Sequence, residues 1–465
     1  MRGFPFRSFV GKVAVIALPV ALQNLLTTTG SMVDTMMIAS LGNTQVGAVG
    51  LCAQFSSLMF SCFWGFVGGG MLFFSQFFGA KDDDGIDRSY GLTLTCMMTV
   101  GVIFCVLAVG FPEMIMRLYT DKAAIREVGV EYLRIVGWGY PLTVLTMAMA
   151  ALLRCTGKVR LPLYGSVAAV LSNIFLNWTL IFGHLGAPRM GVRGAALATV
   201  LAQAVGAVTV FCLALLQRHP YVAAVGKHFR WGRDFSGVYL KKCFPIIMNE
   251  LLIGVGNMVI NVVLGRQPEE AIAALAVFRT LEGLIIGFFA GFSSAASVLV
   301  GTLVGAGEVD TAYARAWRLT FLCQGFIGTV ALLLILCHTP ILTLMGMTGT
   351  SFALAFGMMA VYGAAAFIRM GNWAQNDTFR AGGDATYGTV LEIVFMYALV
   401  LPLTALAGLK FGWPTLLVFA CCYVDEPIRY GLMLRHMFSG RWMKPVTPEG
   451  KAAMAAWRRP DRLRG

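Results

Sequence analysis

The chain has 465 residues, of which 58% are hydrophobic and only 13% are charged, and its mean hydropathy is +0.74. Soluble domains carry about 25% charged residues, so this composition excludes an ordinary water-soluble globular fold. The formal net charge of +13 is compatible with a nucleic-acid-binding protein, but the positions of the basic residues along the chain favour a membrane protein instead.

Mostly apolar runs of 18 or more residues recur along the chain, each long enough to cross a hydrocarbon core of about 30 Å as a helix. We therefore predict an all-α polytopic membrane protein with twelve transmembrane helices. The predicted spans are 10–38, 48–78, 90–111, 132–153, 161–183, 194–216, 238–264, 271–303, 317–338, 354–378, 387–408 and 413–436. The first run is too long for a cleavable signal peptide and lacks an A-x-A site.

The Lys and Arg residues are distributed unevenly between the predicted loops. With both termini placed in the cytoplasm, 26 of the 36 basic residues fall on the cytoplasmic side and seven fall outside. This bias is typical of a multi-pass protein of the bacterial plasma (inner) membrane with both termini cytoplasmic. The basic residues of 441–465 are expected to contact anionic membrane lipids, and no nucleic-acid partner is expected.

Neither a metal centre nor a cofactor is expected. The eleven cysteines lie mostly inside apolar runs and show no paired spacing, which is typical of small residues that fill helix contacts. The chain contains neither a CxxC–CxxC pair nor an HExxH motif, so we predict no structural or catalytic metal beyond a transient sodium site.

The chain repeats itself with a constant offset of 226 residues. Pro19 corresponds to Pro245, and Gly79 corresponds to Gly305. Further pairs with this offset are Ala48 and Ala274, Gly65 and Gly291, Arg154 and Arg380, and Gly157 and Gly383. We predict two six-helix lobes, residues 1–226 and 227–465, arranged as parallel repeats with a binding site between them that opens alternately to each side.

Several motifs then identify a resemblance. The segments ALPVALQNLL, SMVDTMMIASLG, SQFFGAKD, LLRCTGK, SNIFLNWTLIFG and GVRGAALATV occur in order, and the pattern recurs in the second half. From about residue 10 to 445 the chain resembles the multidrug and toxic compound extrusion (MATE) transporters, and within them the DinF-like bacterial branch. The resemblance implies export of small molecules coupled to inward flow of protons or sodium, and we expect a monomer.

Asp34 is the strongest candidate for ion coupling. It lies deep in the first span with no Lys or Arg nearby in sequence. Placing an acid at membrane depth costs free energy, so its presence there points to a function. The resemblance implies that Asn173, Asn177 and Thr199 complete the site. Asn177 stands where the DinF-like branch usually carries a carboxylate, which weakens any sodium site in the first lobe.

The second lobe contains its own candidate acid, Glu250, whose repeat counterpart is Asn24. Asn249, Asn257 and Asn261 lie on the same predicted helix and offer further oxygen atoms. The alternative is a purely structural pairing of Glu250 with Arg369 or Arg279. Further candidates near the two acids are Gln23, Asn24, Asn249, Asn257, Arg279 and Glu282.

Other acids in the second half have simpler interpretations. Arg279 and Glu282 are three residues apart and are expected to neutralise each other. Asp377 and Glu392 lie near predicted cytoplasmic helix ends, where they can reach water. Asp425 and Glu426 are expected to mark the end of the last span and to bind nothing.

Three classes of function remain open, and a fourth, a channel, is the least expected. An ion-coupled exporter of cationic or neutral amphipathic compounds explains the duplication and the few buried acids. A lipid-linked sugar flippase of the same superfamily fits the fold, but we expect it to carry several cations for a pyrophosphate. A membrane-embedded enzyme would need a nucleophile–base pair or a metal, and a channel would need a repeated filter segment; neither is visible.

Overall fold

The computed structural model describes residues 6–223, 226 and 228–458. This described part is helical and contains no strand, apart from one isolated bridge between Gly383 and Met443. The predicted all-α membrane fold is therefore confirmed. Because each helix satisfies its own backbone hydrogen bonds, such segments can cross a bilayer.

Ten helical segments in the described residues are long and apolar enough to cross a membrane. They are α1 (Phe6–Ala39), α2 (Asn43–Ala80), α3 (Asp83–Gly110), α7 (Arg160–Phe182), α8 (Val192–Leu216), α10 (Arg233–Leu264), α11 (Glu269–Ala296) continuing through α12 (Thr302–Gly305), α13 (Val309–Leu336), α15 (Gly349–Gly382), and α16 (Tyr387–Phe395) continuing through α17 (Leu401–Ala405). The segment from α11 to α12 contains a π-helical turn at 297–301. The segment that begins with α16 contains π-helical turns at 396–400 and 406–410.

Two predicted spans are broken in the structure. The span predicted at 132–153 belongs to α5 (Ala123–Val136) and α6 (Gly139–Cys155), which meet at a 51° bend and count together as an eleventh crossing. The span predicted at 413–436 is divided between α18 (Thr415–Cys421) and α19 (Glu426–Ser439). The remaining short helices are α4 (Pro112–Tyr119), α9 (Pro220–Ala223), α14 (His338–Leu344) and α20 (Pro448–Trp457).

The helices form two compact units. Unit 1 comprises residues 1–21, 75–81 and 242–465, and unit 2 comprises residues 22–74 and 82–241. The beginning of α1 and the end of α2 thus belong with the later helices. The predicted lobe boundary at residue 226 concerns the duplication of the sequence and stays a prediction.

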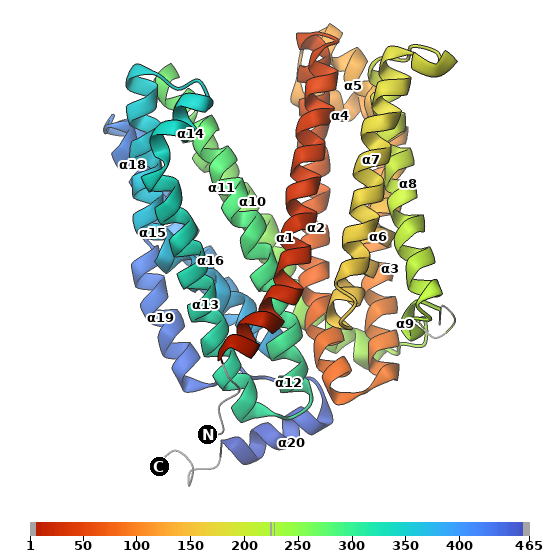
Figure 1. The fold of residues 1–465 in the computed structure, drawn as a ribbon, viewed down its shortest axis with the longest axis vertical. Helices are drawn as coiled ribbons and strands as arrows, with labels where there is room; N and C mark the ends of the chain where they lie inside the picture. Colours follow the sequence, from red (N-terminus) through yellow and green to blue (C-terminus); the bar gives the residue numbers. More distant parts are fainter. Residues whose placement is uncertain (1–5, 224–225, 227, 459–465) are drawn as a thin grey trace. The chain divides into compact units, whose positions relative to one another are not determined.

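In unit 2, α7 runs beside α8 (Figure 1). Glycine allows the close approach of these helices: a Cβ added at Gly165 would overlap Val210, and one added at Gly206 would lie 3.0 Å from Ala169. Small residues at helix crossings are the usual means of association in lipid. This contact fixes how α7 presents its polar residues.

In unit 1, α15 packs against α11 and α13 (Figure 1). Aromatic rings of α11 pack against those of α15: Phe289 contacts Trp373, and Phe278 contacts Tyr362. Charged residues of these packed helices include Arg279 and Glu282 on α11 and Arg369, Asp377 and Arg380 on α15.

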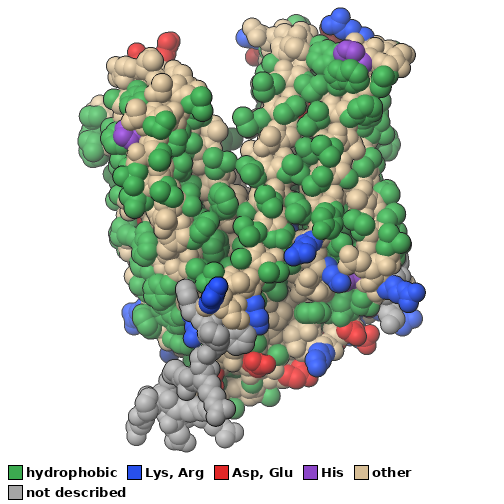
Figure 2. Space-filling model, in the orientation of Figure 1, with side chains coloured by type: hydrophobic (Ala, Val, Ile, Leu, Met, Phe, Trp, Pro, Cys, Tyr) green, Lys and Arg blue, Asp and Glu red, His purple; other side chains and the backbone are tan. Residues whose placement is uncertain are grey.

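Hydrophobic side chains cover much of the visible molecular surface, and Lys and Arg gather mainly toward the helix ends (Figure 2). Large exposed apolar residues occur along the long helices, for example Val106 of α3, Val208 of α8 and Val262 of α10. Such broad apolar surface is unstable in water and fits contact with lipid acyl chains.

Candidate functional site

Asp34 is joined to α7 by a short hydrogen bond. The Asn177 Nδ2 group donates to Asp34 Oδ1 at 2.6 Å and also to Asn173 Oδ1 at 3.2 Å. Asn173 and Asn177 are four residues apart and therefore lie on one face of α7. The structure thus brings three of the predicted site residues into one chain of contacts within unit 2.

The Asp34 carboxylate has no Lys, Arg or His within 4 Å among the residues that the structure describes. Asn177 is fully buried, and its Oδ1 atom has no hydrogen-bond partner in the described residues. A buried amide oxygen without a donor is costly, so the site contains one unused acceptor next to an acid.

One helical turn beyond the site, an apolar cluster packs α1, α7 and α8 together. Its buried members are Ile38, Ile181 and Ala195, and Met37, Leu41, Val46, Val49 and Phe182 pack against them. Ile38 and Ile181 each lie four residues after a site residue, on the same helix faces. The cluster therefore shields the polar site from the end of unit 2 at which α1 and α7 terminate.

Thr199 is near this site but does not bind Asp34 directly. Its hydroxyl donates to the Ala195 carbonyl of its own helix at 3.0 Å. Tyr132 of α5 is buried beside Thr199 and lies close enough to Asp34 for the two side chains to interact electrostatically. Sequence reasoning missed Tyr132, because a tyrosine at the start of a predicted span gives no signal of where its hydroxyl points.

The group that Asn177 directs at Asp34 is its N–H₂ donor. A hard cation such as sodium prefers several oxygen ligands. Among the described residues, no group of three or more His, Cys, Asp and Glu lies close enough together to hold a metal ion.

Gln23 belongs to a second polar contact of unit 2, separate from Asp34. Arg154 Nη2 donates to Gln23 Oε1 at 2.7 Å, and Gln23 Nε2 donates to Ser166 Oγ at 2.9 Å. This chain of contacts joins α1, α6 and α7. Asn24 is partly buried.

In unit 1, Glu250 pairs with Arg380 and not with Arg369 or Arg279, the partners of the alternative interpretation. Arg380 Nη1 lies 3.3 Å from Glu250 Oε1 and 3.8 Å from Asp377 Oδ1. Arg380 is the repeat counterpart of Arg154. In each half, this arginine contacts the first long helix of the same half, α1 or α10. The partner is neutral Gln23 in one case and Glu250 in the other.

The predicted pair of Arg279 and Glu282 forms, with 2.6 Å between Nη1 and Oε2. Arg279 Nη2 also donates to Asn261 at 3.2 Å, while Asn257 on the same helix is exposed. Glu282 lies 3.7 Å from Arg369 as well. These residues therefore cross-link α10, α11 and α15.

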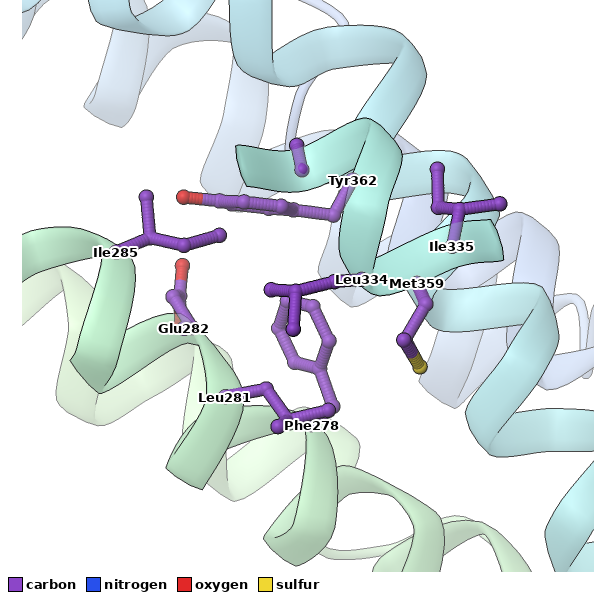
Figure 3. Close-up of a pocket in the computed structure, with 9 residues that line it drawn as sticks. Phe278, Leu281, Glu282, Ile285, Leu334, Ile335, Met359 and Tyr362 are labelled. Atoms are coloured by element: carbon purple, nitrogen blue, oxygen red, sulfur yellow. The ribbon is translucent and has the colours of Figure 1, made fainter. Parts of the chain in front are cut away.

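A small cavity lies beside Glu282 (Figure 3). Its volume of about 20 Å³ is enough for one water molecule and far too small for an organic cargo. Glu282 Oε1 and Tyr362 Oη border it and have no hydrogen-bond partner among the described residues. The remaining lining is apolar.

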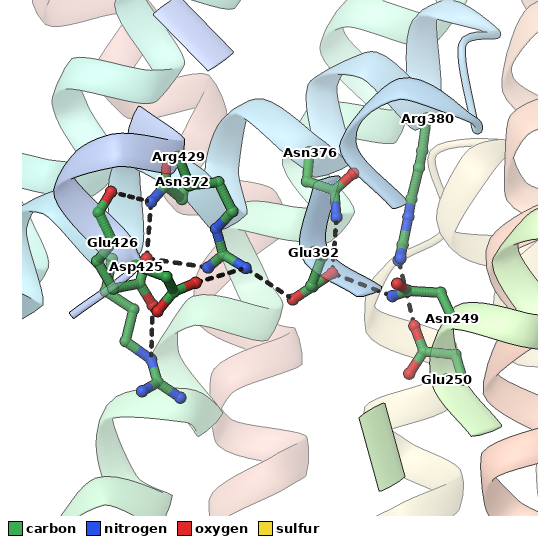
Figure 4. A network of polar contacts seen from close by, with 10 residues as sticks. Asn249, Glu250, Asn372, Asn376, Arg380, Glu392, Asp425, Glu426 and Arg429 are labelled. Carbon is green, nitrogen blue, oxygen red and sulfur yellow. Dashed lines mark hydrogen bonds and ion pairs between the residues drawn. The ribbon is translucent and has the colours of Figure 1, made fainter. Parts of the chain in front are cut away.

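A polar network in unit 1 differs from the expectation (Figure 4). Asp425 and Glu426 lie where α19 begins, and the expectation that they bind nothing is wrong: both are buried and pair with Arg429, at 3.6 and 2.9 Å. Arg369 lies 3.9 Å from Glu426 and is surrounded by the rings of Tyr362, Trp373 and Tyr423.

Asp377 and Glu392 also do not reach freely into water. Their side chains are only 16% and 15% exposed, and both contact arginines, Arg380 and Arg429 respectively. The sequence reasoning placed them at helix ends because it treated each helix alone. Neighbouring helices that cover those ends cannot be seen in a one-dimensional pattern.

Comparison with known proteins gives a consistent result. The sequence profile of the MatE family matches the chain twice, over residues 19–179 and 245–417. The two matches begin at Pro19 and Pro245, which are separated by the repeat offset.

Curated relatives cover most of the chain at low identity. The probable multidrug resistance protein YoeA of Bacillus subtilis is 25% identical over 395 residues, covering 84% of this chain and 85% of the relative. The uncharacterized transporter YisQ of the same organism is 22% identical, covering 88% and 90%. The probable multidrug resistance protein NorM of Thermotoga maritima is 23% identical, covering 92% of each chain.

Solved structures share the fold. A MATE structure in complex with MaL6 has a TM-score of 0.83 at 17% identity and covers 95% of this chain and 98% of its own. An outward-facing multidrug resistance MATE transporter has a TM-score of 0.82 at 17% identity, covering 92% and 96%.

Proposed function

The chain belongs to the MatE family, and from this premise we propose that it exports small organic compounds from a bacterial cell in exchange for protons, by alternating access. Asp34 is the residue that carries the coupling proton. The observation behind this assignment is the Asp34–Asn177 hydrogen bond of 2.6 Å in a setting without a cationic partner. The proposal makes the protein a secondary active transporter rather than an enzyme.

A single proton can reverse the direction of that hydrogen bond. Ionised Asp34 only accepts, and it receives the Asn177 N–H. Protonated Asp34 gains an O–H that must donate, and Asn177 Oδ1, which has no donor, becomes its acceptor when the amide rotates by half a turn. The rotated N–H₂ group then turns away from Asp34. Protonation therefore changes how α1 and α7 are held together.

Sodium is the alternative coupling ion. It would need oxygen atoms where Asn177 now directs N–H donors, and it would gain one carboxylate only. This arrangement supports the proton as the coupling ion, and the experiment below separates the two.

The cargo is proposed to be cationic or neutral and amphipathic. Met32 and Met36, within one turn of Asp34 on α1, are 54% and 70% exposed. Flexible methionine side chains adapt to varied apolar shapes, and a carboxylate attracts cations. Two relatives are named probable multidrug resistance proteins, which supports a small-molecule cargo.

Glu250 is proposed as a second coupling acid, in unit 1. It shares Arg380 with Asp377, so two carboxylates face one guanidinium. The surplus negative charge in a partly buried site favours uptake of a proton. The orientation with both termini in the cytoplasm rests on the distribution of Lys and Arg, and we propose that a single chain is the working unit.

The test is transport by the purified protein in liposomes, with a fluorescent organic cation such as ethidium. A pH gradient and a sodium gradient are imposed separately. We expect accumulation driven by the pH gradient and none by the sodium gradient. Asp34→Asn should abolish it, whereas the matched control Asp84→Asn, at an exposed acid of the same unit, should transport like the wild type.

Two results contradict the proposal. Full pH-driven transport by Asp34→Asn would remove Asp34 from the coupling step. Transport driven by sodium alone would replace the proton as the coupling ion.

A further inference from the structure

Glu392 occupies a central position in the polar network of unit 1 (Figure 4). Its Oε2 atom accepts hydrogen bonds from Asn249 Nδ2 at 3.1 Å and from Asn376 Nδ2 at 3.2 Å. Its Oε1 atom lies 3.8 Å from Arg429 Nη1. One side chain of α16 thereby connects α10, α15 and α19.

Each of the two amides adjoins an acid in the sequence. Asn249 precedes Glu250 on α10, and Asn376 precedes Asp377 on α15. Adjacent residues of a helix point about 100° apart. A contact that fixes the rotation of the helix at one residue therefore also fixes the direction in which the next residue leaves the helix.

Glu392 is the residue that orients both amides. Asn249 Oδ1 and Asn376 Oδ1 are buried and have no hydrogen-bond partner in the described part of the chain. No contact through these oxygen atoms competes with the bonds to Glu392. Without this acceptor, both amides would be free to rotate, and neither would hold its helix in position.

Arg429 contributes less to holding Glu392 than the amides do. Its Nη2 donates to Glu426 at 2.9 Å, and its Nη1 lies 3.6 Å from Asp425. Its charge is shared among three acids, of which Glu392 is the farthest at 3.8 Å. The role of Glu392 therefore rests mainly on its acceptor oxygen.

We propose that Glu392 is a positioning residue for the acid pair on Arg380: by binding Asn249 and Asn376 it sets the rotation of α10 and α15 and so the geometry in which Glu250 and Asp377 share one guanidinium. The inference rests on the proposed function, in which Glu250 takes up a proton. It assigns no proton to Glu392 itself.

The test measures proton binding directly and needs neither cargo nor a gradient. Proton uptake by the purified protein in detergent is followed with a pH indicator as a function of pH. The difference between wild type and Glu250→Gln isolates the step that belongs to Glu250. In Glu392→Ala this step should move by about one pH unit, the scale expected when the surroundings of an ionisable group change.

Two further variants separate positioning from charge. Glu392→Gln keeps an acceptor oxygen of the same reach and should move the step clearly less than Glu392→Ala does. Glu270→Ala removes an exposed acid of the same unit and should leave the step unchanged. Glu250→Gln combined with Glu392→Ala should bind no fewer protons than Glu250→Gln alone.

The inference is overturned if Glu392→Ala lowers thermal stability but leaves the step in place, which is the result of a merely structural residue. It is also overturned if Glu392→Gln moves the step as far as Glu392→Ala, or if Glu250→Gln binds as many protons as the wild type. Failure of pH-driven transport in liposomes, by contrast, contradicts the proposed function and leaves this measurement valid.

Discussion

Gly79 and Gly305 are repeat counterparts, and each packs against the helix that carries the other. Gly79 of α2 faces the backbone of Thr302, and Gly305 of α12 faces the backbone of Gln76. Gln76 and Thr302 are themselves 226 residues apart. The duplication has thus produced a reciprocal backbone contact inside unit 1, in which a Cβ at either glycine would overlap a carbonyl oxygen.

Replacing Gly305 by alanine should therefore destabilise unit 1. The overlap is with backbone and not with the end of a flexible side chain, so the helices must separate. Overpacking of this kind costs about 1–3 kcal/mol. We expect a melting temperature in detergent several degrees below that of the wild type.

The matched control is Gly283→Ala on α11, where nothing lies within 4 Å of an added Cβ. It should melt at or slightly above the wild-type temperature, because alanine favours helix over glycine. Equal melting temperatures for Gly305→Ala and the wild type would contradict the close contact.

The two asparagines of α7 should differ in importance. Asn177→Leu removes the donor to Asp34, while Asn173→Leu removes only a contact to Asn177. Since a hydrogen bond to a charged group contributes about 1.5–3 kcal/mol, Asn177→Leu should lower pH-driven transport by about tenfold or more. Asn173→Leu should have the smaller effect. The reverse order in a liposome assay would show that the contact to Asp34 is unimportant.

Acid should loosen the segment that follows α8. His219 is buried there, and its ring contacts the Thr156 hydroxyl at 2.9 Å. Burial lowers the pKa of His219 from 6.5 to about 4, and the nearby positive charge of Lys158 acts in the same direction.

The opened segment binds a proton near pH 6.5, whereas the packed segment does so only near pH 4. The stability that comes from packing neutral His219 is therefore complete above pH 6.5 and is lost as the pH falls from 6.5 toward 4. Hydrogen exchange of residues 217–223, corrected for its intrinsic rate, should accelerate by up to about tenfold per pH unit in this window. His219→Gln should remove that acceleration; its persistence in this variant would assign it to another group.

An ionic contact of Asp384 holds the chain after α19. Asp384 accepts a hydrogen bond from His436 at 3.0 Å and lies 2.8 Å from Lys444 Nζ, beside the bridge between Gly383 and Met443. Burial raises the pKa of Asp384, but the bonds from His436 and Lys444 outweigh it and leave the pKa below its usual value.

The contribution of Asp384 is therefore present at neutral pH and is lost only as the pH falls through this lowered pKa. At pH 7, Asp384→Asn should increase hydrogen exchange in residues 441–447 several-fold. Glu449→Gln, at an exposed acid close by, is the control and should not. Unchanged exchange in Asp384→Asn would show that the backbone bridge alone holds this segment.

The sequence was sufficient for most of the helices because long apolar runs are visible in local patterns. Asp34 stands out as the acid within such a run. Asn173 and Asn177 were named from the resemblance, and their spacing places both on one face of α7. Their contact with Asp34 required the fold, since 143 residues separate Asn177 from it.

The sequence was insufficient for the charged network of the second half. Whether Asp425 and Glu426 face water or Arg429 depends on a break between α18 and α19, and apolar composition does not encode that break. The partner of Glu250 could not be found from the sequence for a related reason: which of Arg279, Arg369 and Arg380 meets it depends on the fold, and the structure pairs it with Arg380.

The central claim is that Asp34 carries the proton that is exchanged for cargo. The most direct measurement records dye movement and internal pH together in liposomes, with cargo flow driving protons in the opposite direction and no pH gradient imposed. We predict proton counterflow in a fixed ratio to dye for the wild type and none for Asp34→Asn at equal protein content. Dye and proton fluxes in the wild-type ratio for Asp34→Asn would contradict the account.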